Sequence, residues 1–134
     1  MSGQVTLRQY QALAQFRHAL RVFLRFSEEA ARAAGLTPHQ HQLLLAIKGH
    51  VGPHPPTASD LAEALQLRLH STVELIDRAE AAGLLTRRPD PDDARRQLLR
   101  LTPAGEKHLT DLSRLHRDEL WRFAQMAATL DGLR

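Results

Sequence analysis

The sequence predicts a single, mostly α-helical domain, residues 1–134, that contains one short β-hairpin. The chain has 134 residues, which is the usual size of one domain. Apolar residues make up 43% of the sequence but aromatic residues only 4%, and Leu and Ala, which favour helices, supply much of the apolar share. Long stretches at both ends of the chain also show helical periodicity. These observations favour helices over a β-sandwich.

A long amphipathic helix is expected near the N-terminus. Its apolar residues recur mostly at steps of three or four, with arginines between them, as packing along one side of a helix requires. They are Leu7, Tyr10, Leu13, Phe16, Leu20, Phe23, Leu24 and Ala31. Gly35 is expected to end this helix.

A second helix is expected over residues 38–48. Thr37 can cap its N-terminus, Pro38 suits the first helical position, and Gln40 has the spacing of a capping box. Three apolar residues of this helix are expected in the core: Leu43, Leu44 and Ile47. The next segment, 49–56, contains two glycines and three prolines and is therefore expected to be a loop.

Two short helices separated by a tight turn are expected after this loop. Thr57 and Asp60 have capping spacing at the start of the first helix, and Ser71 and Glu74 have it at the start of the second. The second helix is predicted over 71–82, before a glycine suited to end it. Such a pair is a helix-turn-helix candidate.

A β-hairpin is expected directly after the helix pair. Residues 84–88 and 97–102 have the composition of short strands, and 89–96 (PDPDDARR) consists of turn-forming residues. A hairpin in this position is a wing. The sequence therefore predicts an α+β winged helix-turn-helix over residues 36–102.

The last helix is expected to begin with the Thr-Pro pair at 102–103. Its apolar stripe consists of Leu109, Leu112, Leu115, Leu120, Phe123, Ala127 and Leu130. Neither terminal helix has a partner helix in the central module, so both stripes are expected to meet those of a second copy. Segments 7–34 and 103–134 are therefore predicted to be dimerisation helices.

The charge balance permits nucleic acid as a partner. The net charge is +3, and of the 18 basic residues only Lys48 and Lys107 are lysines. Arginine suits the recognition of phosphates and base edges. A GC-rich genome would produce the same arginine bias, so composition alone does not select this function.

Several function classes find no support in the sequence. The absence of cysteine excludes disulfides, thiol redox sensing and thiolate metal sites. No nucleophile elbow or glycine-rich phosphate loop is present, so we expect no enzyme activity and no cofactor. A histidine cluster lacks neighbouring carboxylates, so no metal site is expected at His39, His41, His50 and His54. No apolar run reaches membrane-spanning length and no signal peptide is evident, so a cytoplasmic protein is expected.

The expected DNA contacts lie on the predicted helix 71–82, in the turn before it and on the wing. Arg95 is the strongest candidate because it lies in the hairpin turn and the narrow minor groove attracts arginine. Glu74 could accept a hydrogen bond from cytosine or serve only as a capping residue, and Asp77 is expected to pair with an arginine of the protein. The full set is Arg68, His70, Ser71, Thr72, Glu74, Arg78, Arg88, Arg95 and Arg96.

The order of these motifs resembles the MarR (multiple antibiotic resistance regulator) family. The matching stretches are 36–45 (LTPHQHQLLL), 60–65 (DLAEAL), 71–78 (STVELIDR), 83–85 (GLL), 93–95 (DAR) and 101–105 (LTPAG). The most specific feature is Asp-x-Arg shortly before Leu-Thr-x-x-Gly. The resemblance covers about residues 7–120.

The resemblance implies a homodimeric regulator of transcription that binds pseudo-palindromic double-stranded DNA sequence-specifically. The helix 71–82 would enter the major groove, Arg95 would approach the minor groove, and Asp93 would support the wing. The absence of cysteine excludes the peroxide-sensing branch of the family. The region after Arg117 is short and shows no evident break between the last two helices of the family pattern.

Many members of that family bind small, often aromatic or phenolic, acids beside the dimer helices and then release DNA. The corresponding expectation is a ligand-responsive repressor with an anionic or aromatic effector. Its cleft is expected at the junction of the first two helices, where Arg17, Arg21, His39 and His41 could gather. The alternative is a winged-helix protein-interaction module without sequence-specific DNA binding.

Overall fold

The computed structural model describes residues 3–133, which form helices and one β-hairpin. In chain order the elements are α1 (Leu7–Ala33), α2 (Pro38–Lys48), α3 (Ala58–Leu65), α4 (Leu69–Ala81), β1 (Leu85–Pro89), β2 (Gln97–Leu101), α5 (Pro103–Ala127) and the 3₁₀ helix η1 (Ala128–Leu133). The predicted fold class, a mostly helical winged helix-turn-helix, is confirmed. No helix within residues 3–133 combines the length and apolar character needed to cross a membrane.

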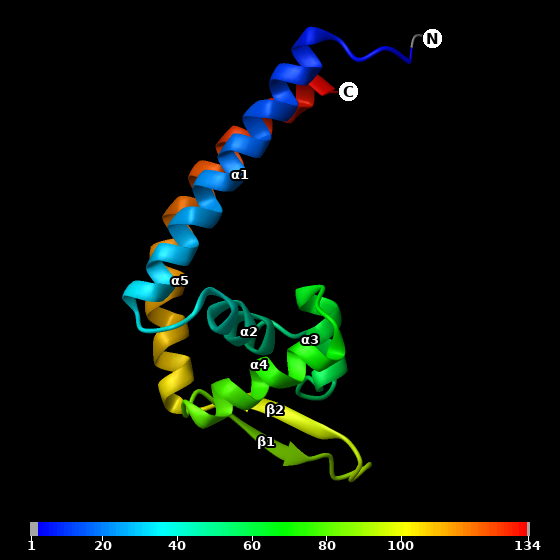
Figure 1. The fold of residues 1–134 in the computed structure, drawn as a ribbon, viewed down its shortest axis with the longest axis vertical. Helices are drawn as coiled ribbons and strands as arrows, with labels where there is room; N and C mark the ends of the chain where they lie inside the picture. Colours follow the sequence, from blue (N-terminus) through cyan, green and yellow to red (C-terminus); the bar gives the residue numbers. More distant parts are fainter. Residues whose placement is uncertain (1–2, 134) are drawn as a thin grey trace.

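The molecule has two parts, a rod and a lobe (Figure 1). The rod consists of α1 and α5, which run antiparallel and pack against each other. The lobe, which contains α2, α3, α4 and the hairpin, lies beside one end of the rod, and both termini lie at the other end. The hairpin is antiparallel, with Leu85 opposite Leu101 and Pro89 opposite Gln97.

Aromatic side chains hold α1 and α5 together within one chain. The ring centroid of Phe123 lies 5.8 Å from that of Phe16 and 5.6 Å from that of Phe23. The three rings therefore meet within one chain, where they remain half-buried, and the meeting of the two stripes with a second copy stays a prediction. Other large apolar side chains of the two helices remain exposed, among them Leu7, Tyr10, Leu13, Leu24, Leu115, Leu120 and Trp121.

Local capping signals were reliable at α2, α3 and α5 and misleading at α4. Thr37 with Gln40, and Thr57 with Asp60, form the predicted capping boxes. The predicted capping box of Ser71 and Glu74 is wrong, because α4 begins two residues earlier and its N-cap, Arg68, makes no side-chain cap. Ser71 therefore lies inside the first turn of α4.

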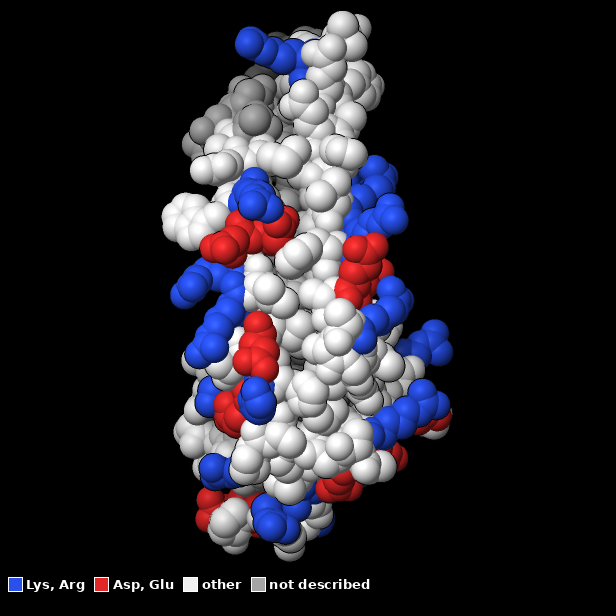
Figure 2. Space-filling view, turned by 90° about the vertical axis from the view of Figure 1, so that its left-hand side faces the viewer, with Lys and Arg blue, Asp and Glu red and all other residues white. Residues whose placement is uncertain are grey.

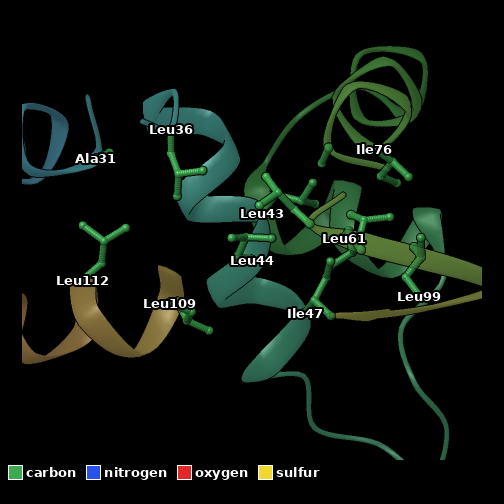
Figure 3. Close-up of a cluster of buried hydrophobic side chains, with 13 residues drawn as sticks. Ala31, Leu36, Leu43, Leu44, Ile47, Leu61, Ile76, Leu99, Leu109 and Leu112 are labelled. Atoms are coloured by element: carbon green, nitrogen blue, oxygen red, sulfur yellow. The ribbon is translucent and has the colours of Figure 1, made fainter. Parts of the chain in front are cut away.

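The core is built around α2 (Figure 3). Leu43 and Leu44 of this helix are completely buried. Figure 3 shows α5 on one side of them, with Leu109 and Leu112, and the lobe on the other, with α3, α4 and β2. Full burial of a leucine side chain stabilises a fold by about 2 kcal/mol. The packing of α2 therefore joins the rod to the lobe.

The start of α5 packs directly on the segment that follows α4. The Thr102 hydroxyl donates to the Gly83 carbonyl at 2.6 Å, and the Thr102 N–H donates to the Leu84 carbonyl at 3.1 Å. Gly105 N–H donates to the Thr102 hydroxyl at 3.1 Å. A Cβ atom on Gly105 would lie 2.1 Å from the Leu84 carbonyl oxygen, so this position requires glycine. These contacts account for the spacing in Leu-Thr-x-x-Gly.

We predict that Gly105→Ala lowers the free energy of unfolding by about 3 kcal/mol, because a backbone carbonyl must move to admit the methyl group. Urea denaturation would measure this change. Ala104→Ser, at the exposed neighbouring position, is the control and should change stability by less than about 0.5 kcal/mol. Equal effects of the two substitutions would contradict the packing account.

Candidate nucleic-acid interface

The helix α4 has one buried side and one polar, exposed side. Ser71, Glu74 and Arg78 are exposed, whereas Thr72 and Ile76 are buried. The prediction that Thr72 contacts DNA is wrong. Its side chain has 0% exposure and its hydroxyl donates to the Arg68 carbonyl at 2.9 Å. Thr72 lies four residues before Ile76 and therefore on the same, buried side of the helix.

The N-terminal turn of α4 offers hydrogen-bond donors and polar side chains to solvent. Because no side chain caps this end, the first backbone N–H groups of the helix are available to a ligand. His70 and Glu74 are both exposed and lie one turn apart, with His70 Nε2 3.2 Å from Glu74 Oε1. Glu74 therefore has a partner on its own helix in place of the predicted capping role.

An arginine of the wing pairs with the C-terminal half of α4. Arg87 of β1 forms an ion pair with Asp77, and its Nη2 atom lies 3.1 Å from Glu80 Oε1. The prediction that Asp77 pairs with an arginine of the protein is confirmed. No sequence pattern identified Arg87 as that partner, because the pairing depends on how β1 packs against α4.

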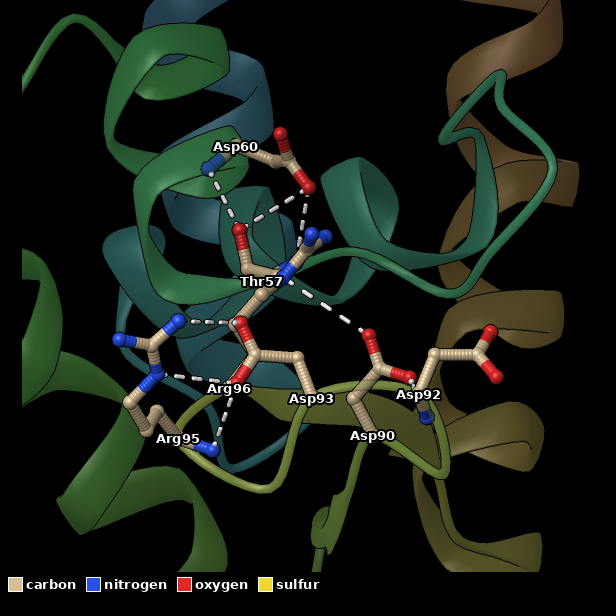
Figure 4. Close-up of polar contacts among 7 residues, drawn as sticks. All are labelled: Thr57, Asp60, Asp90, Asp92, Asp93, Arg95 and Arg96. Atoms are coloured by element: carbon tan, nitrogen blue, oxygen red, sulfur yellow. Dashed lines mark hydrogen bonds and ion pairs between the residues drawn. The ribbon is translucent and has the colours of Figure 1, made fainter.

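The tip of the wing presents Arg95 to solvent (Figure 4). Its side chain is 91% exposed, and its Nε atom lies 3.1 Å from Asp93 Oδ1. The backbone N–H of Arg95 donates to the same carboxylate oxygen at 3.1 Å. Hydrogen bonds from the Arg95 side chain and backbone lower the pKa of Asp93. Asp93, which the lowered pKa keeps charged, thus orients the Arg95 side chain, which remains exposed.

Arg96 is directed toward the protein rather than away from it. Its Nε atom lies 3.8 Å from Asp90 Oδ2, and Asp90 is only 4% exposed. Figure 4 shows the Arg96 guanidinium pointing toward Thr57 and Asp60 at the start of α3. Asp90 also accepts from the Asp92 N–H at 2.8 Å. Arg96 therefore pairs with Asp90 within the wing and faces the start of α3, a role that sequence reasoning missed.

The wing and the helix pair border a common groove of about 510 Å³. Leu69 and Val73 of α4 line one side of it, and Arg87 and Arg95 of the wing line the other. Arg88 and Arg68 are both exposed. The Arg88 side chain makes no hydrogen bond or ion pair with any residue in the described range 3–133. The predicted contact residues thus form two groups, on α4 and on the wing.

A second cavity, of about 610 Å³, lies where the rod meets the lobe. It is lined by residues of α1, α2 and α5, among them Phe23, Ser27, His39, His41, His116, Arg117 and Leu120. Of the four residues expected to gather at this junction, the two histidines line the cavity and the two arginines do not, and the binding of an effector there stays a prediction. Arg17 does not line this cavity, and Arg21 lines a separate depression on α1 with Arg25 and Glu28. Both arginines project from an exposed side of α1.

Comparison with known proteins identifies the family. The model of the MarR family matches residues 34–96. The HTH-type transcriptional regulator YcgE of Bacillus subtilis, itself uncharacterized, is 37% identical over 89 residues, which make up 66% of this chain and 56% of that protein. The chain belongs to the MarR family. It spans just over half the length of the curated relatives that it matches.

Solved MarR-family structures have the same fold as this MarR-family chain. One MarR family transcription regulator superposes with a TM-score of 0.73 at 29% identity, covering 87% of this chain and 75% of the other. A variant of MarR from E. coli in complex with operator DNA gives a TM-score of 0.71 at 24% identity, covering 87% and 86% of the two chains.

The rings of two histidines lie against each other in the cavity of this MarR-family chain, with their planes tilted by 48°. The ring centroids of His41 and His116 are 4.8 Å apart. His116 Nδ1 lies 2.7 Å from the Leu112 carbonyl oxygen, and its Nε2 lies 2.8 Å from the Ser27 hydroxyl. His41 is 3% exposed, and its Nδ1 has no hydrogen-bond partner among residues 3–133. Burial lowers the pKa of His41, and the nearby His116 lowers it further.

We predict that this MarR-family chain loses stability as pH falls below about 6.5, partly through His41. Because the folded state favours neutral His41, the unfolded chain binds more protons just below the ordinary histidine pKa. The contribution of His41 is therefore fully present above that pKa and decreases as pH falls toward the lowered value. Melting temperatures between about pH 8 and pH 5 would measure it.

The decisive comparison is between His41→Gln and a control, His39→Gln, at an exposed position. His41→Gln should show a shallower decrease in melting temperature below about pH 6.5, whereas His39→Gln should keep the wild-type profile. Identical pH profiles for all three proteins would contradict the assignment.

Proposed function

We propose that this MarR-family chain regulates transcription by binding double-stranded DNA sequence-specifically, with α4 in the major groove and the wing beside the minor groove. The observation that carries the proposal is the placement of Arg95, which is exposed at the wing tip and oriented by Asp93. It borders the same groove as the N-terminal part of α4. Support also comes from a similar protein, MarR from E. coli, whose structure contains operator DNA.

The proposed contacts divide into base reading and phosphate binding. His70, Ser71 and Glu74 lie on the exposed N-terminal half of α4 and are proposed to reach base edges. Arg68 and Arg88 are exposed and are proposed to contact phosphates, together with the free N–H groups at the start of α4. Arg78 follows along the exposed side of the same helix and suits a phosphate. Arg96 is proposed to support DNA binding indirectly, by stabilising the turn of the wing, since its guanidinium faces Asp90.

A homodimer is proposed as the active form. Figure 2 shows uncharged surface running down one side of the molecule from the free ends of the rod, with charged side chains flanking it. Trp121 is 68% exposed and Tyr10 60%, both on the rod. Large apolar side chains on one small domain gain stability when a second copy covers them. Two-fold symmetry would then place two α4 helices on half-sites about 10 bp apart, centre to centre.

A small acidic, aromatic effector is proposed for the cavity between rod and lobe. Its walls are mainly apolar, including Phe23 and Leu120, and Arg117 lies at its edge to receive a carboxylate. The cavity borders α2, which packs against the helix pair. A ligand that changes the position of α2 relative to the rod would change the spacing of the α4 helices in the dimer, and thereby the DNA affinity.

We predict that Arg95→Ala weakens binding to a selected duplex by about 1–3 kcal/mol and lowers the salt slope by about one, because a minor-groove guanidinium is lost. Asp93→Ala should weaken binding through loss of wing order. Fluorescence anisotropy at several salt concentrations would measure both effects. Ala94→Ser is the control, since it changes the same turn without changing charge. Unchanged affinity and salt slope for Arg95→Ala would favour the protein-interaction module.

We predict that aromatic carboxylates such as benzoate and salicylate raise the melting temperature and lower DNA affinity. Arg117→Ala should weaken their binding about tenfold, because a charge-assisted hydrogen bond is lost. Arg114→Ala is the control, since Arg114 is exposed and lies outside the cavity. If no aromatic acid in a broad panel changes either quantity, the effector proposal is wrong while the DNA-binding proposal stands.

A further inference from the structure

The helix proposed to read DNA carries more negative than positive charge. Within α4, Arg78 is the only Lys or Arg, whereas Glu74, Asp77 and Glu80 are carboxylates, so one cation against three anions gives a net charge of −2. DNA phosphates repel such a helix. A DNA-binding chain with this sequence therefore needs a source of positive charge beside α4.

The structure places that charge on Arg87, in the wing strand β1. The Arg87 Nε and Nη2 atoms lie 3.3 Å and 3.1 Å from Glu80 Oε1, and Nη2 also pairs with Asp77. These carboxylates, by accepting hydrogen bonds, raise the pKa of Arg87. The Arg87 side chain is 28% exposed, against 91% for Arg95 at the wing tip. The Arg87 side chain thus forms ion pairs with α4, whereas the Arg95 side chain does not.

We propose that Arg87 is a positioning residue for DNA binding: it holds the wing against α4 and offsets part of the negative charge of Asp77 and Glu80 without touching DNA. The proposal rests on the proposed DNA-binding function and assigns to Arg87 a role distinct from that of the contact residues. One guanidinium lowers the negative charge that approaches the phosphates. The same guanidinium fixes the angle between the two elements that would enter adjacent grooves.

The contribution of Arg87 to overall stability is expected to be small, because partly exposed ion pairs stabilise proteins weakly. The fold has a separate source of stability in the core around α2, to which Leu85 and Leu99 of the hairpin contribute. Loss of Arg87 should therefore leave the protein folded, with a looser wing and a more negative α4. This separates its role from that of a residue required for folding.

The first test measures the wing without DNA. Hydrogen exchange of the β1 and β2 amides should be about threefold faster in Arg87→Gln than in the wild type, because the hairpin opens more often. Arg88→Gln is the matched control: it removes the same charge from the next residue of the strand, where the side chain is exposed. Equal exchange rates in Arg87→Gln and Arg88→Gln would overturn the positioning role, whether or not the chain selects a DNA sequence.

The second test is a mutant cycle on a duplex that the wild-type chain selects from a random library. Arg87→Gln should weaken binding about tenfold, and adding Asp77→Asn with Glu80→Gln should restore only part of it, because the carboxylates then no longer repel the phosphates but the wing still lacks its link to α4. In the wild-type background the same two neutral substitutions should change affinity less than about twofold.

The cycle distinguishes positioning from direct contact. If Arg87 touched a phosphate, removing the two carboxylates would raise affinity by the same factor in both backgrounds, and this additive result would overturn the proposal. If the wild-type chain selects no duplex, the proposed function fails, and the exchange measurement still decides whether Arg87 holds the wing.

Discussion

The burial of α2 is the constraint on which the rest of the structure depends. Leu43 and Leu44 are completely enclosed, and α2 contacts both helices of the rod as well as α3, α4 and β2. The position of the helix pair relative to α1 and α5 is therefore set by how α2 packs. Because the cavity with His41 and His116 lies at this junction, a change there reaches α4 through a single rigid helix.

The fold pairs two arginines of the wing with carboxylates of other residues and leaves several other arginines of the lobe exposed. Arg87 is held by two carboxylates of α4, and Arg96 faces a buried aspartate. Arg95 keeps its guanidinium exposed although Asp93 orients it. The number of basic residues therefore overstates the positive surface available to DNA. What matters is which guanidinium groups the fold leaves in solvent.

Sequence reasoning succeeded where structure is determined locally. The capping boxes at Thr37 and Thr57 and the turn of the wing follow from neighbours within a few residues. It failed where the outcome depends on packing. The Ser71 pattern predicted the wrong N-cap because α4 begins earlier, and Thr72 lies on the buried side of α4. The pairings of Arg87 with α4, of Arg96 with Asp90 and of His41 with His116 arise only from tertiary structure.

Sequence-specific DNA recognition by a two-fold dimer is the central claim, and selection from a library of random duplexes tests it most directly. The proposed function predicts enrichment of pseudo-palindromes whose half-sites are about 10 bp apart, centre to centre, bound with an affinity that falls as salt rises. Recovery of sequences without a shared motif, or of a single half-site bound by a monomer, would contradict it.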